Sequence, residues 1–427
     1  MGLKFKEFCT FKEGYVNPSQ KEPKYFDGPI KWLRATDLNN SYVYTTTRTL
    51  TEEGFKSARK SALMFKPNTI SISKSGTVGR LGILKDYMCG NRAVINIDVN
   101  SEIMNMEYIF YWLLNNQNYI KDLAVGSVQR NLYVSVLENL EIEKRPIFEQ
   151  KAIANILSTI DKKIEINNQM NERLEEMAQV LFKRWFVDFE FPNDNGESYK
   201  SSGGEMIESE LGMIPKGWEV SKLNEHCDVQ KGLSYKGKHL VEDGTPMLNL
   251  GNINPGGGFR REKMKYYDGE HKDRHKVKPG DIIIANTDMT QDRLILGSPI
   301  IVPEFNKRDI IFTHHLFALR QVKLPKSFLY YYIKSDDFRE RAESFATGTT
   351  VLAISKNAVV DIEMVIPQSK ILNKYKCIVD SILDEIALNN KENVRMEKIR
   401  DLLLPKLMSG EIRVPIDDNI VEEQVNN

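Results

Sequence analysis

The sequence has few cysteines, and their positions argue against two kinds of site. The four cysteines, Cys9, Cys89, Cys227 and Cys377, lie far apart and form no C-x-x-C pair. Disulfide frameworks and zinc–cysteine sites in small domains both use closely spaced cysteines. The pattern therefore indicates a reduced environment, and we expect a cytoplasmic protein without a metal site built on cysteine.

Long apolar runs are absent as well. No segment approaches the roughly 18 uninterrupted apolar residues that a membrane-spanning helix needs. The N-terminal stretch MGLKFKEFCTFKEG has no apolar core of the kind that signal peptides carry. We therefore expect neither a membrane span nor secretion.

The chain also has no net charge, because its 59 Lys and Arg residues balance its 59 Asp and Glu residues. Two broad segments are mildly basic: residues 1–145 hold 20 basic against 15 acidic residues, and residues 217–366 hold 22 against 20. Such surfaces permit contact with phosphate but do not require it, and ordinary solvated surfaces explain the same distribution. Charge alone leaves nucleic-acid binding open.

Motifs for catalysis are incomplete. The stretch GLSYKGKH (232–239) approaches the P-loop pattern, but His239 stands where the magnesium-binding hydroxyl belongs. His271 and His275 have metal-ligand spacing without the HExxH pattern, in a highly charged segment typical of a solvated face. No nucleophile–base arrangement is evident. We therefore predict that this chain is not an enzyme and binds neither a metal nor a cofactor.

What the sequence does contain is a repeat, offset by 222 residues, whose best-matched part is a long helix. Steps of four and three residues alternate without a break in both copies, which is typical of a coiled-coil seam. The first copy comprises Ile153, Leu157, Ile160, Ile164, Asn167, Asn171, Leu174, Ala178, Leu181 and Trp185, and the second Tyr375, Val379, Ile382, Ile386, Asn389, Asn393, Met396, Arg400, Leu403 and Leu407. Asparagine in a seam fixes register at a cost in stability. Two such helices in one chain predict that they pair with each other.

The repeat extends into the segment before each helix. In both copies a Lys-Pro turn leads into β-prone residues, and a short aromatic helix follows, at 106–116 and 326–338. We predict an α/β (α+β) fold with two similar globular domains, separated by two long helices that form an antiparallel coiled coil with pseudo-two-fold symmetry. The predicted boundaries are a first domain at 1–145, a helix at 146–190, an exposed linker at 191–216, a second domain at 217–366, a helix at 367–412 and a tail at 413–427.

Two loops in equivalent places carry the polar groups most suited to DNA. Hydroxyl, ammonium and guanidinium groups reach phosphates or base edges, and Asn, Gln and Arg make paired contacts with bases. The candidates are Lys74, Ser75, Thr77 and Arg80 in the first copy and Asn286, Thr287, Gln291 and Arg293 in the second. Different side chains in a shared framework are typical of two domains that recognise different sequences. An ordinary hairpin turn explains the glycines of the first loop equally well.

Glycine-centred loops after the short aromatic helices give a second candidate surface. Their polar residues are Gln129, Arg130 and Asn131 in the first copy and Thr349 and Thr350 in the second. A plain turn between helix and strand is the alternative interpretation.

The C-terminal ends of both long helices are more apolar than one seam requires. We predict a partner-binding patch there, formed by Phe182, Trp185, Phe186, Leu403, Leu407 and Met408. Packing of these side chains on the chain's own domains is the alternative.

Taken together, these segments resemble the DNA-specificity subunit of type I restriction–modification systems. The stretches that carry the resemblance are SKSGTVG (73–79), the helical segment 149–192, IPKGWEVSKL (214–223) and LLLPKLMSGEIRV (402–414). The resemblance covers almost the whole chain. It implies two target-recognition domains held apart by paired helices, two methyltransferase subunits docked on them, and nuclease–translocase subunits that join for restriction. It also implies that S-adenosylmethionine, ATP and magnesium are bound by those partner subunits.

We therefore expect a non-catalytic subunit that recognises a bipartite, asymmetric site on double-stranded DNA and positions methyltransferase subunits over target adenines. A protein-binding scaffold with two similar domains is the alternative from another class. A nucleotide-dependent enzyme that uses residues 232–239 is a third.

Overall fold

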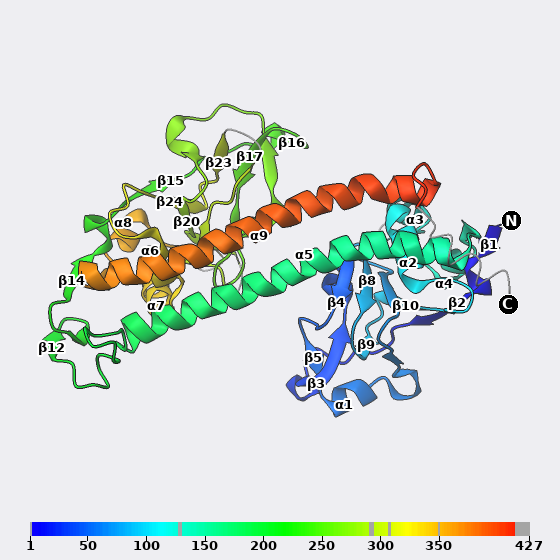
Figure 1. Ribbon diagram of the computed structural model, residues 1–427, viewed down its shortest axis with the longest axis horizontal. Helices are drawn as coiled ribbons and strands as arrows, with labels where there is room; N and C mark the ends of the chain where they lie inside the picture. The colour runs from blue at the N-terminus through cyan, green and yellow to red at the C-terminus, as the bar shows by residue number, and fades with distance from the viewer. Residues whose placement is uncertain (1, 127–129, 290–293, 306–308, 349–350, 415–427) are drawn as a thin grey trace. The chain divides into compact units, whose positions relative to one another are not determined.

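The computed structural model describes residues 2–126, 130–289, 294–305, 309–348 and 351–414, and it contains two compact units (Figure 1). Unit 1 comprises Met1–Ile166 and Glu392–Asn427, and unit 2 comprises Asn167–Lys391. Each unit therefore combines one globular domain with part of each long helix. This division differs from the predicted boundaries, in which each helix forms a segment of its own.

Unit 1 is built on two mixed sheets. Its strands are β1 (Gly2–Lys4), β2 (Cys9–Glu13), β3 (Phe26–Leu33), β4 (Ser41–Val43), β5 (Thr49–Leu50), β6 (Met64–Phe65), β7 (Ile70–Ser73), β8 (Leu81–Leu84), β9 (Met88–Gly90), β10 (Val94–Val99) and β11 (Glu141–Glu143). One sheet has the order β2-β10-β7-β8-β4 and the other β5-β3-β9-β6, while β1 pairs with β11. Strands β7 and β8 are buried along their whole length, which explains their continuous apolar runs.

Short helices pack beside these sheets. They are α1 (Glu52–Lys56), α2 (Met106–Asn115), α3 (Gln117–Asp122) and α4 (Val134–Glu138). Helix α1 lies against β3 and β5 of the second sheet, whereas α2 and α4 contact β8 and β2 of the first. Asn105 caps α2, because its side chain accepts a hydrogen bond from the backbone N–H of Tyr108. Buried residues of α2, among them Tyr108, Ile109 and Tyr111, join the core formed with β7, β8 and β10.

Unit 2 repeats this plan. Its strands are β12 (Met206–Ser209), β13 (Gly212–Pro215), β14 (Glu219–Lys222), β15 (Asp228–Lys231), β16 (Leu240–Val241), β17 (Thr245–Leu248), β18 (Lys265–Tyr267), β19 (Lys276–Val277), β20 (Ile282–Ala285), β21 (Thr287–Asp288), β22 (Pro299–Ile301), β23 (Ile310–Phe312), β24 (Leu316–Arg320), β25 (Leu352–Ala353) and β26 (Glu363–Ile366). Its short helices are α6 (Lys326–Lys334), α7 (Asp336–Ser344) and α8 (Lys356–Val360).

Strand pairing confirms the predicted internal repeat. Strand β3 lies parallel to β9 in unit 1, and β17 lies parallel to β23 in unit 2. The central sheets correspond as well: β10 pairs antiparallel with β2 and β7, and β24 pairs antiparallel with β15 and β20. The predicted mixed α/β class is therefore correct, and one framework occurs twice.

One predicted helix differs in detail. The segment 326–338 forms two helices, because the Ser335 side chain accepts a hydrogen bond from the N–H of Phe338 and caps a new helix at α7. Serine favours such caps over helix interiors because its hydroxyl competes for backbone N–H groups.

The two long helices are α5 (Ile147–Phe182), which continues in a π-helical turn (Lys183–Val187), and α9 (Ser369–Ser409). Every position of the predicted seam in both helices is buried or partly buried. In unit 1 the helices run antiparallel, since Arg145 contacts the Met408 carbonyl (2.8 Å) while Asp161 pairs with Arg400 (2.9 Å). None of the described helices has the length and apolar character of a membrane span.

Asparagines form the polar contact of the seam in unit 2. The Asn389 amide donates to Asn171 Oδ1 at 2.9 Å, and the Asn171 amide donates to Asn390 Oδ1 at 3.1 Å. An amide ladder is satisfied only when these residues face each other, so it fixes the register of this stretch.

Most residues of the predicted linker at 191–216 are exposed, but the segment contains regular structure that its composition did not indicate. Strands β12 and β13 form a hairpin there, and Phe191 is buried against Tyr199 and Trp218, with ring centroids at 4.6 and 4.9 Å. The glycines and serines mark turns between these contacts. The aromatic residues, which the composition argument left out, attach the segment to unit 2.

Candidate nucleic-acid interface

In each unit, the two loop regions predicted to touch DNA meet at one backbone junction. In unit 1 the N–H of Leu132 donates to the Lys74 carbonyl at 2.9 Å, and in unit 2 the N–H of Ile354 donates to the Asn286 carbonyl at 2.9 Å. Lys74 and Asn286 also donate their own N–H groups to equivalent carbonyls, those of Ala93 (2.7 Å) and His315 (3.0 Å). Lys74 and Asn286 thus occupy the same position in two copies of one framework.

The loop after β7 in unit 1 is shaped by a buried serine. Ser73 Oγ donates to the Thr77 carbonyl at 2.5 Å and accepts from the Arg80 N–H at 2.8 Å. The Gly79 N–H donates to the Ser73 carbonyl at 2.9 Å, with Gly79 at φ +84°. A positive φ suits glycine, so this close turn explains one of the two glycines that the sequence places here.

Side chains of this loop differ in their freedom to contact a ligand. Lys74 is only 19% exposed and pairs with Glu13 of β2 at 2.9 Å. Thr77 is exposed, while Ser75 and Arg80 are partly buried. Thr77 and Arg80 therefore lie at the surface beside a cation whose charge is already balanced.

The neighbouring loop of unit 1 ends in a short backbone bridge. Val125 and Asn131 exchange hydrogen bonds of 3.0 and 2.8 Å, and Arg130 is exposed, 4.0 Å from Asp122. An exposed ion pair at this distance contributes little, so the Arg130 guanidinium is available to an incoming phosphate.

In unit 2 the equivalent position is held by Asn286, and the structure does not support its predicted contact with DNA. Asn286 is only 2% exposed, and its side-chain amide donates to the His314 carbonyl at 3.0 Å. It therefore holds two strands together instead of facing a ligand. The reason is that β20 is buried throughout and the chain continues inward for one more residue.

Thr287 follows on strand β21, which pairs with β25, and it remains partly exposed. Its hydroxyl shares a hydrogen bond of 2.9 Å with Nδ1 of His315. The next residue, Asp288, is buried and accepts the N–H groups of Ile295 (2.6 Å) and Leu296 (3.1 Å).

Sequence reasoning missed the groups around Thr287. His314 and His315 directly precede β24, and their ring centroids are 3.9 Å apart. The pKa of His315 is lowered, first by burial and then by the charges of His314, Lys231 and Lys265. The sequence signal available was a pair of adjacent histidines directly before an apolar strand. The search for helix and strand periodicity gave no reason to consider this pair.

Five further predicted DNA contacts lie outside the described residues. They are Gln129, Gln291, Arg293, Thr349 and Thr350.

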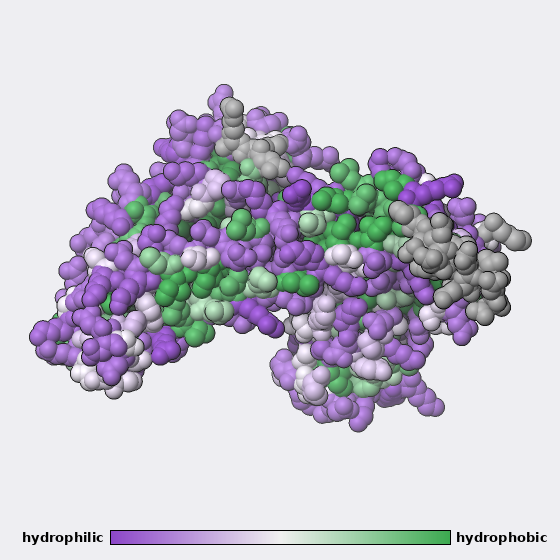
Figure 2. Space-filling model, in the orientation of Figure 1, coloured by the Kyte–Doolittle hydropathy of each residue, from purple (hydrophilic) through white to green (hydrophobic). Residues whose placement is uncertain are grey.

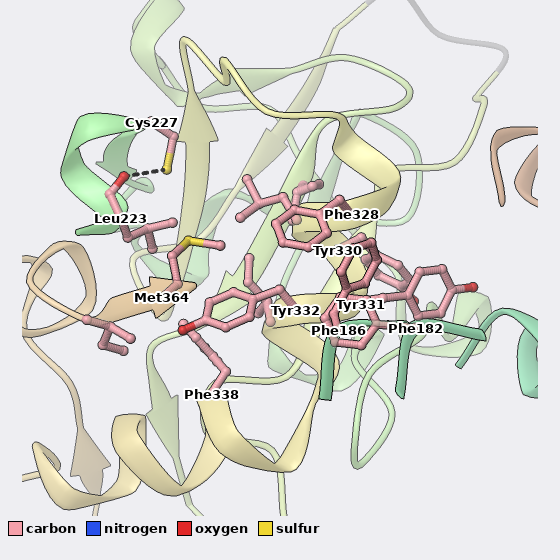
Figure 3. Close-up of a cluster of buried hydrophobic side chains, with 14 of the residues drawn as sticks. Phe182, Phe186, Leu223, Cys227, Phe328, Tyr330, Tyr331, Tyr332, Phe338 and Met364 are labelled. Atoms are coloured by element: carbon pink, nitrogen blue, oxygen red, sulfur yellow. Dashed lines mark hydrogen bonds between the residues drawn. The ribbon is translucent and has the colours of Figure 1, made fainter. Parts of the chain in front are cut away.

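The expectation of an exposed apolar patch at the helix ends is wrong for the residues named. Phe182, Trp185 and Phe186 are at most 8% exposed and belong to the core of unit 2, where Phe186 meets Phe328 with ring centroids at 4.9 Å (Figure 3). Leu407 and Met408 are buried in the core of unit 1, and Leu403 packs against it. The alternative interpretation, packing on the chain's own domains, describes these residues. The apolar side chains that the helix seam does not require are buried in the cores of the globular domains.

Other apolar side chains of the long helices do face solvent. In unit 2 they are Met170 (42% exposed), Met177 (60%) and Val180 (66%) on α5, and in unit 1 Leu402 (67%) on α9. None of these residues occupies a position of the four-three seam. Apolar residues of the helices outside the seam are therefore the sequence signal that could have identified them. Figure 2 shows hydrophobic side chains among the largely hydrophilic ones over the helices.

The P-loop-like stretch does not form a phosphate-binding loop. It ends in a three-residue 3-10 helix (Gly237–His239) followed directly by strand β16, whereas a P-loop leads into an α-helix. Within the described residues, no group of three or more His, Cys, Asp and Glu side chains is arranged to hold a metal ion.

Comparison with known proteins agrees with this geometry. The family model for the type I restriction modification DNA specificity domain matches twice, at residues 3–176 and 215–398. The chain belongs to this family. The two matches coincide with the two copies of the repeated framework.

Relatives in this family span most of the chain. The MjaIX specificity subunit of Methanocaldococcus jannaschii is 27% identical, over 94% of this chain and 91% of its own length. The HindI specificity subunit of Haemophilus influenzae is 24% identical, over 77% and 82%. The crystal structure of the type I restriction–modification S subunit from M. genitalium shares the fold, with a TM-score of 0.52 and 17% identity over 98% of this chain and 96% of that one.

Membership of this family decides the general role of the chain. It carries two DNA specificity domains of a type I restriction–modification system, and it is a non-catalytic specificity subunit.

Proposed function

We propose that the chain recognises a bipartite, asymmetric target on double-stranded DNA, with one half-site bound by each domain. The observation that carries the proposal is the equivalence of Lys74 and Asn286. Identical backbone contacts surround them, yet the side chains beside them differ in charge, size and hydrogen bonding. Two copies of one framework with different surfaces suit two different half-sites.

Affinity and specificity draw on different groups. Arg80 and Arg130 supply guanidinium groups for phosphates, and such contacts dominate affinity and make it depend on salt. Ser75, Thr77 and Thr287 carry hydroxyls, which donate to and accept from base edges as well as phosphates. Glu13, which neutralises Lys74, limits the positive potential of the first domain.

Partner subunits perform the chemistry in this proposal. Two methyltransferase subunits dock on the chain and act on target adenines, and restriction–translocase subunits join them. S-adenosylmethionine, ATP and magnesium are bound by those partners, in the cytoplasm. The exposed Met170, Met177 and Val180 on α5 and Leu402 on α9 support a docking role for the long helices.

The methylome of a host tests the proposal directly. The chain is expressed with its neighbouring methyltransferase and compared with the methyltransferase alone, with Arg80→Ala, and with the matched control Lys24→Ala. Lys24 belongs to an exposed ion pair with Glu53 in the same domain and is part of neither candidate loop. We expect a gapped, asymmetric adenine-methylated motif that disappears without the chain and weakens in Arg80→Ala only.

An unchanged methylome with an active methyltransferase would contradict the proposal. It would instead favour a scaffold whose two domains bind proteins.

A further inference from the structure

The histidine pair of unit 2 has no equivalent in unit 1. By backbone position, His314 and His315 correspond to Arg92 and Ala93, because Lys74 and Asn286 donate to the carbonyls of Ala93 and His315. All six histidines of the chain lie between residues 226 and 315. A property that depends on imidazole therefore belongs to the second domain alone.

Charge around the pair also differs from unit 1. Strand pairing places Glu13 opposite Ile95 and Lys231 opposite Phe317, so Lys231 stands where unit 1 has the carboxylate that balances Lys74. Lys231 is exposed, and no ion pair of Lys231 occurs among the described residues. The second position thus carries an unbalanced cation beside the imidazoles.

The groups that face His315 come from several elements. Lys231 lies on β15, Lys265 on β18, and His314 next to it in the chain, and all three disfavour a positive charge on His315. Thr287 on β21 shares its Nδ1 hydrogen bond. The carboxylate on β21, Asp288, is buried and accepts two backbone N–H groups.

Two further details suit an anionic ligand. Lys265 donates to the Tyr235 hydroxyl at 3.1 Å and lies 5.5 Å from the centre of that ring, which orients its ammonium. Nδ1 of His314 is buried and has no hydrogen-bond partner among the described residues. Cations, a paired hydroxyl and two imidazoles that have no acidic partner among the described residues are groups suited to phosphate oxygens.

We propose that His314 and His315, with Lys231 and Lys265, bind a backbone phosphate of the DNA at the second half-site and that this contact takes up a proton. The inference rests on the proposed function and deepens it. The DNA phosphate supplies a negative charge beside these cations, and the imidazole of the bound complex gains a partner for its second N–H.

The sign of the resulting pH dependence follows from the contact. In the free protein, burial and then the charges of His314, Lys231 and Lys265 lower the pKa of His315 and so disfavour the charged ring. A bound phosphate favours the protonated ring and raises its pKa, so binding takes up a proton. Affinity is therefore highest at acidic pH and falls as pH rises through the pKa of the complex, by up to about tenfold per pH unit for one proton.

The test measures DNA affinity of the chain in complex with its methyltransferase, by fluorescence anisotropy between pH 5.5 and 8. The probe is a duplex that carries the methylated motif, with a scrambled duplex as reference. We expect wild-type affinity to fall about three- to tenfold between pH 6 and 7. In a His314→Gln/His315→Gln variant the fall disappears and the slope of affinity against salt decreases by about one. His271→Gln, a partly exposed histidine of the same unit, keeps the wild-type profile.

Each outcome has a distinct meaning. If the complex binds the motif duplex no better than the scrambled one, the proposed function fails. If it binds the motif selectively but affinity is independent of pH, or the double variant keeps the wild-type pH profile, the proton-coupled contact is wrong. If the double variant changes the preferred sequence while the salt slope stays constant, the histidines contact a base and the phosphate assignment is wrong.

Discussion

The two domains share a backbone framework but differ in the chemistry placed at one position of it. In unit 1 the position holds Lys74, whose charge is balanced by Glu13 at 2.9 Å. In unit 2 it holds the buried amide of Asn286, with Lys231 at the place of the carboxylate. The comparison teaches that backbone hydrogen bonds maintain the framework while side chains at its surface are free to differ.

The same comparison applies to the cores. Phe182 of α5 and Phe186 of the π-helical turn after it contribute to the core of unit 2, and 222 residues later Leu404 and Met408 of α9 contribute to the core of unit 1. Each globular domain is thus completed by the end of a helix that follows the other domain in the chain. Aromatic residues fill this place in one unit and aliphatic residues in the other.

Removing one of these core side chains should have the largest effect. We expect Phe186→Ala to lower the free energy of unfolding by about 3–5 kcal/mol, because it leaves a cavity against Phe328 and Tyr375. Met408→Ala should cost unit 1 about 2–5 kcal/mol. Both losses of unfolding free energy can be measured by unfolding each variant in urea and monitoring hydrogen exchange separately in the two units. The exposed Met177 provides the control, and an equal loss in Met177→Ala would refute the core assignment.

The second largest effect on stability should come from a buried ion pair in unit 1. In unit 1 Asp161 accepts hydrogen bonds from Tyr111 (2.6 Å) and Arg400 (2.9 Å), and its side chain is 5% exposed. Asp161→Ala leaves Arg400 without its buried partner and should cost about 3 kcal/mol. In unit 2 Glu175 accepts a hydrogen bond from the Tyr331 hydroxyl at 2.9 Å but is 25% exposed, so Glu175→Ala should cost less. Thermal unfolding of both variants measures the two costs. An equal loss of stability in Asp161→Ala and Glu175→Ala would contradict this difference between the units.

The shared position itself gives a smaller effect. Asn286→Ala should cost about 1–3 kcal/mol, because it leaves the buried His314 carbonyl without its amide donor. Lys74→Ala should cost about 1 kcal/mol or less, since its ion pair is partly exposed. Chemical denaturation of both variants checks the order, and a costlier Lys74→Ala would show that the ion pair and not the amide is the structural element.

Charge at this position should change DNA binding slightly and in opposite directions. Glu13→Gln releases Lys74 for a phosphate and should raise affinity about threefold at moderate salt, whereas Lys231→Gln should lower it about threefold. Anisotropy titrations with the motif duplex measure both. A decrease in Glu13→Gln would mean that the carboxylate orients Lys74 and does not compete for it.

The smallest predicted difference is in stability against pH. Burial lowers the pKa of His226, His275 and His315 in unit 2 below the usual 6.5. Because the unfolded chain takes up protons first, this contribution is fully present well above pH 6.5 and is lost as pH falls below it. Unit 1 contains no histidine. Hydrogen exchange at pH 7.5 and 5.5 should show a histidine-dependent loss in unit 2, which the triple glutamine variant removes.

Periodic features were predictable from the sequence. The four-three spacing of the long helices and the repeat at 222 residues depend only on the order of apolar residues, and every seam position is buried or partly buried in the structure. The repeat also identified the two loop regions of each copy, whereas their meeting at one backbone junction is a finding of the structure. The periodic features follow from local geometry, which a single sequence carries.

Burial of individual polar residues was not predictable. Asn286 extends a buried strand by one residue, and nothing in the alternation of β20 marks whether the next side chain points inward. The apolar ends of the long helices had two possible destinations, a partner or the chain's own cores, and tertiary packing decides between them. The hairpin of β12 and β13 was hidden by a composition typical of linkers.

Independent recognition by two domains is the central claim, and the methylome of a loop variant tests it most directly. Residues Ser75, Thr77 and Arg80 are replaced together by alanine, with the second domain unchanged. We predict that one half of the methylated motif is relaxed or lost while the other half and the interval between them stay the same. A change in both halves, or in the interval alone, would contradict the account.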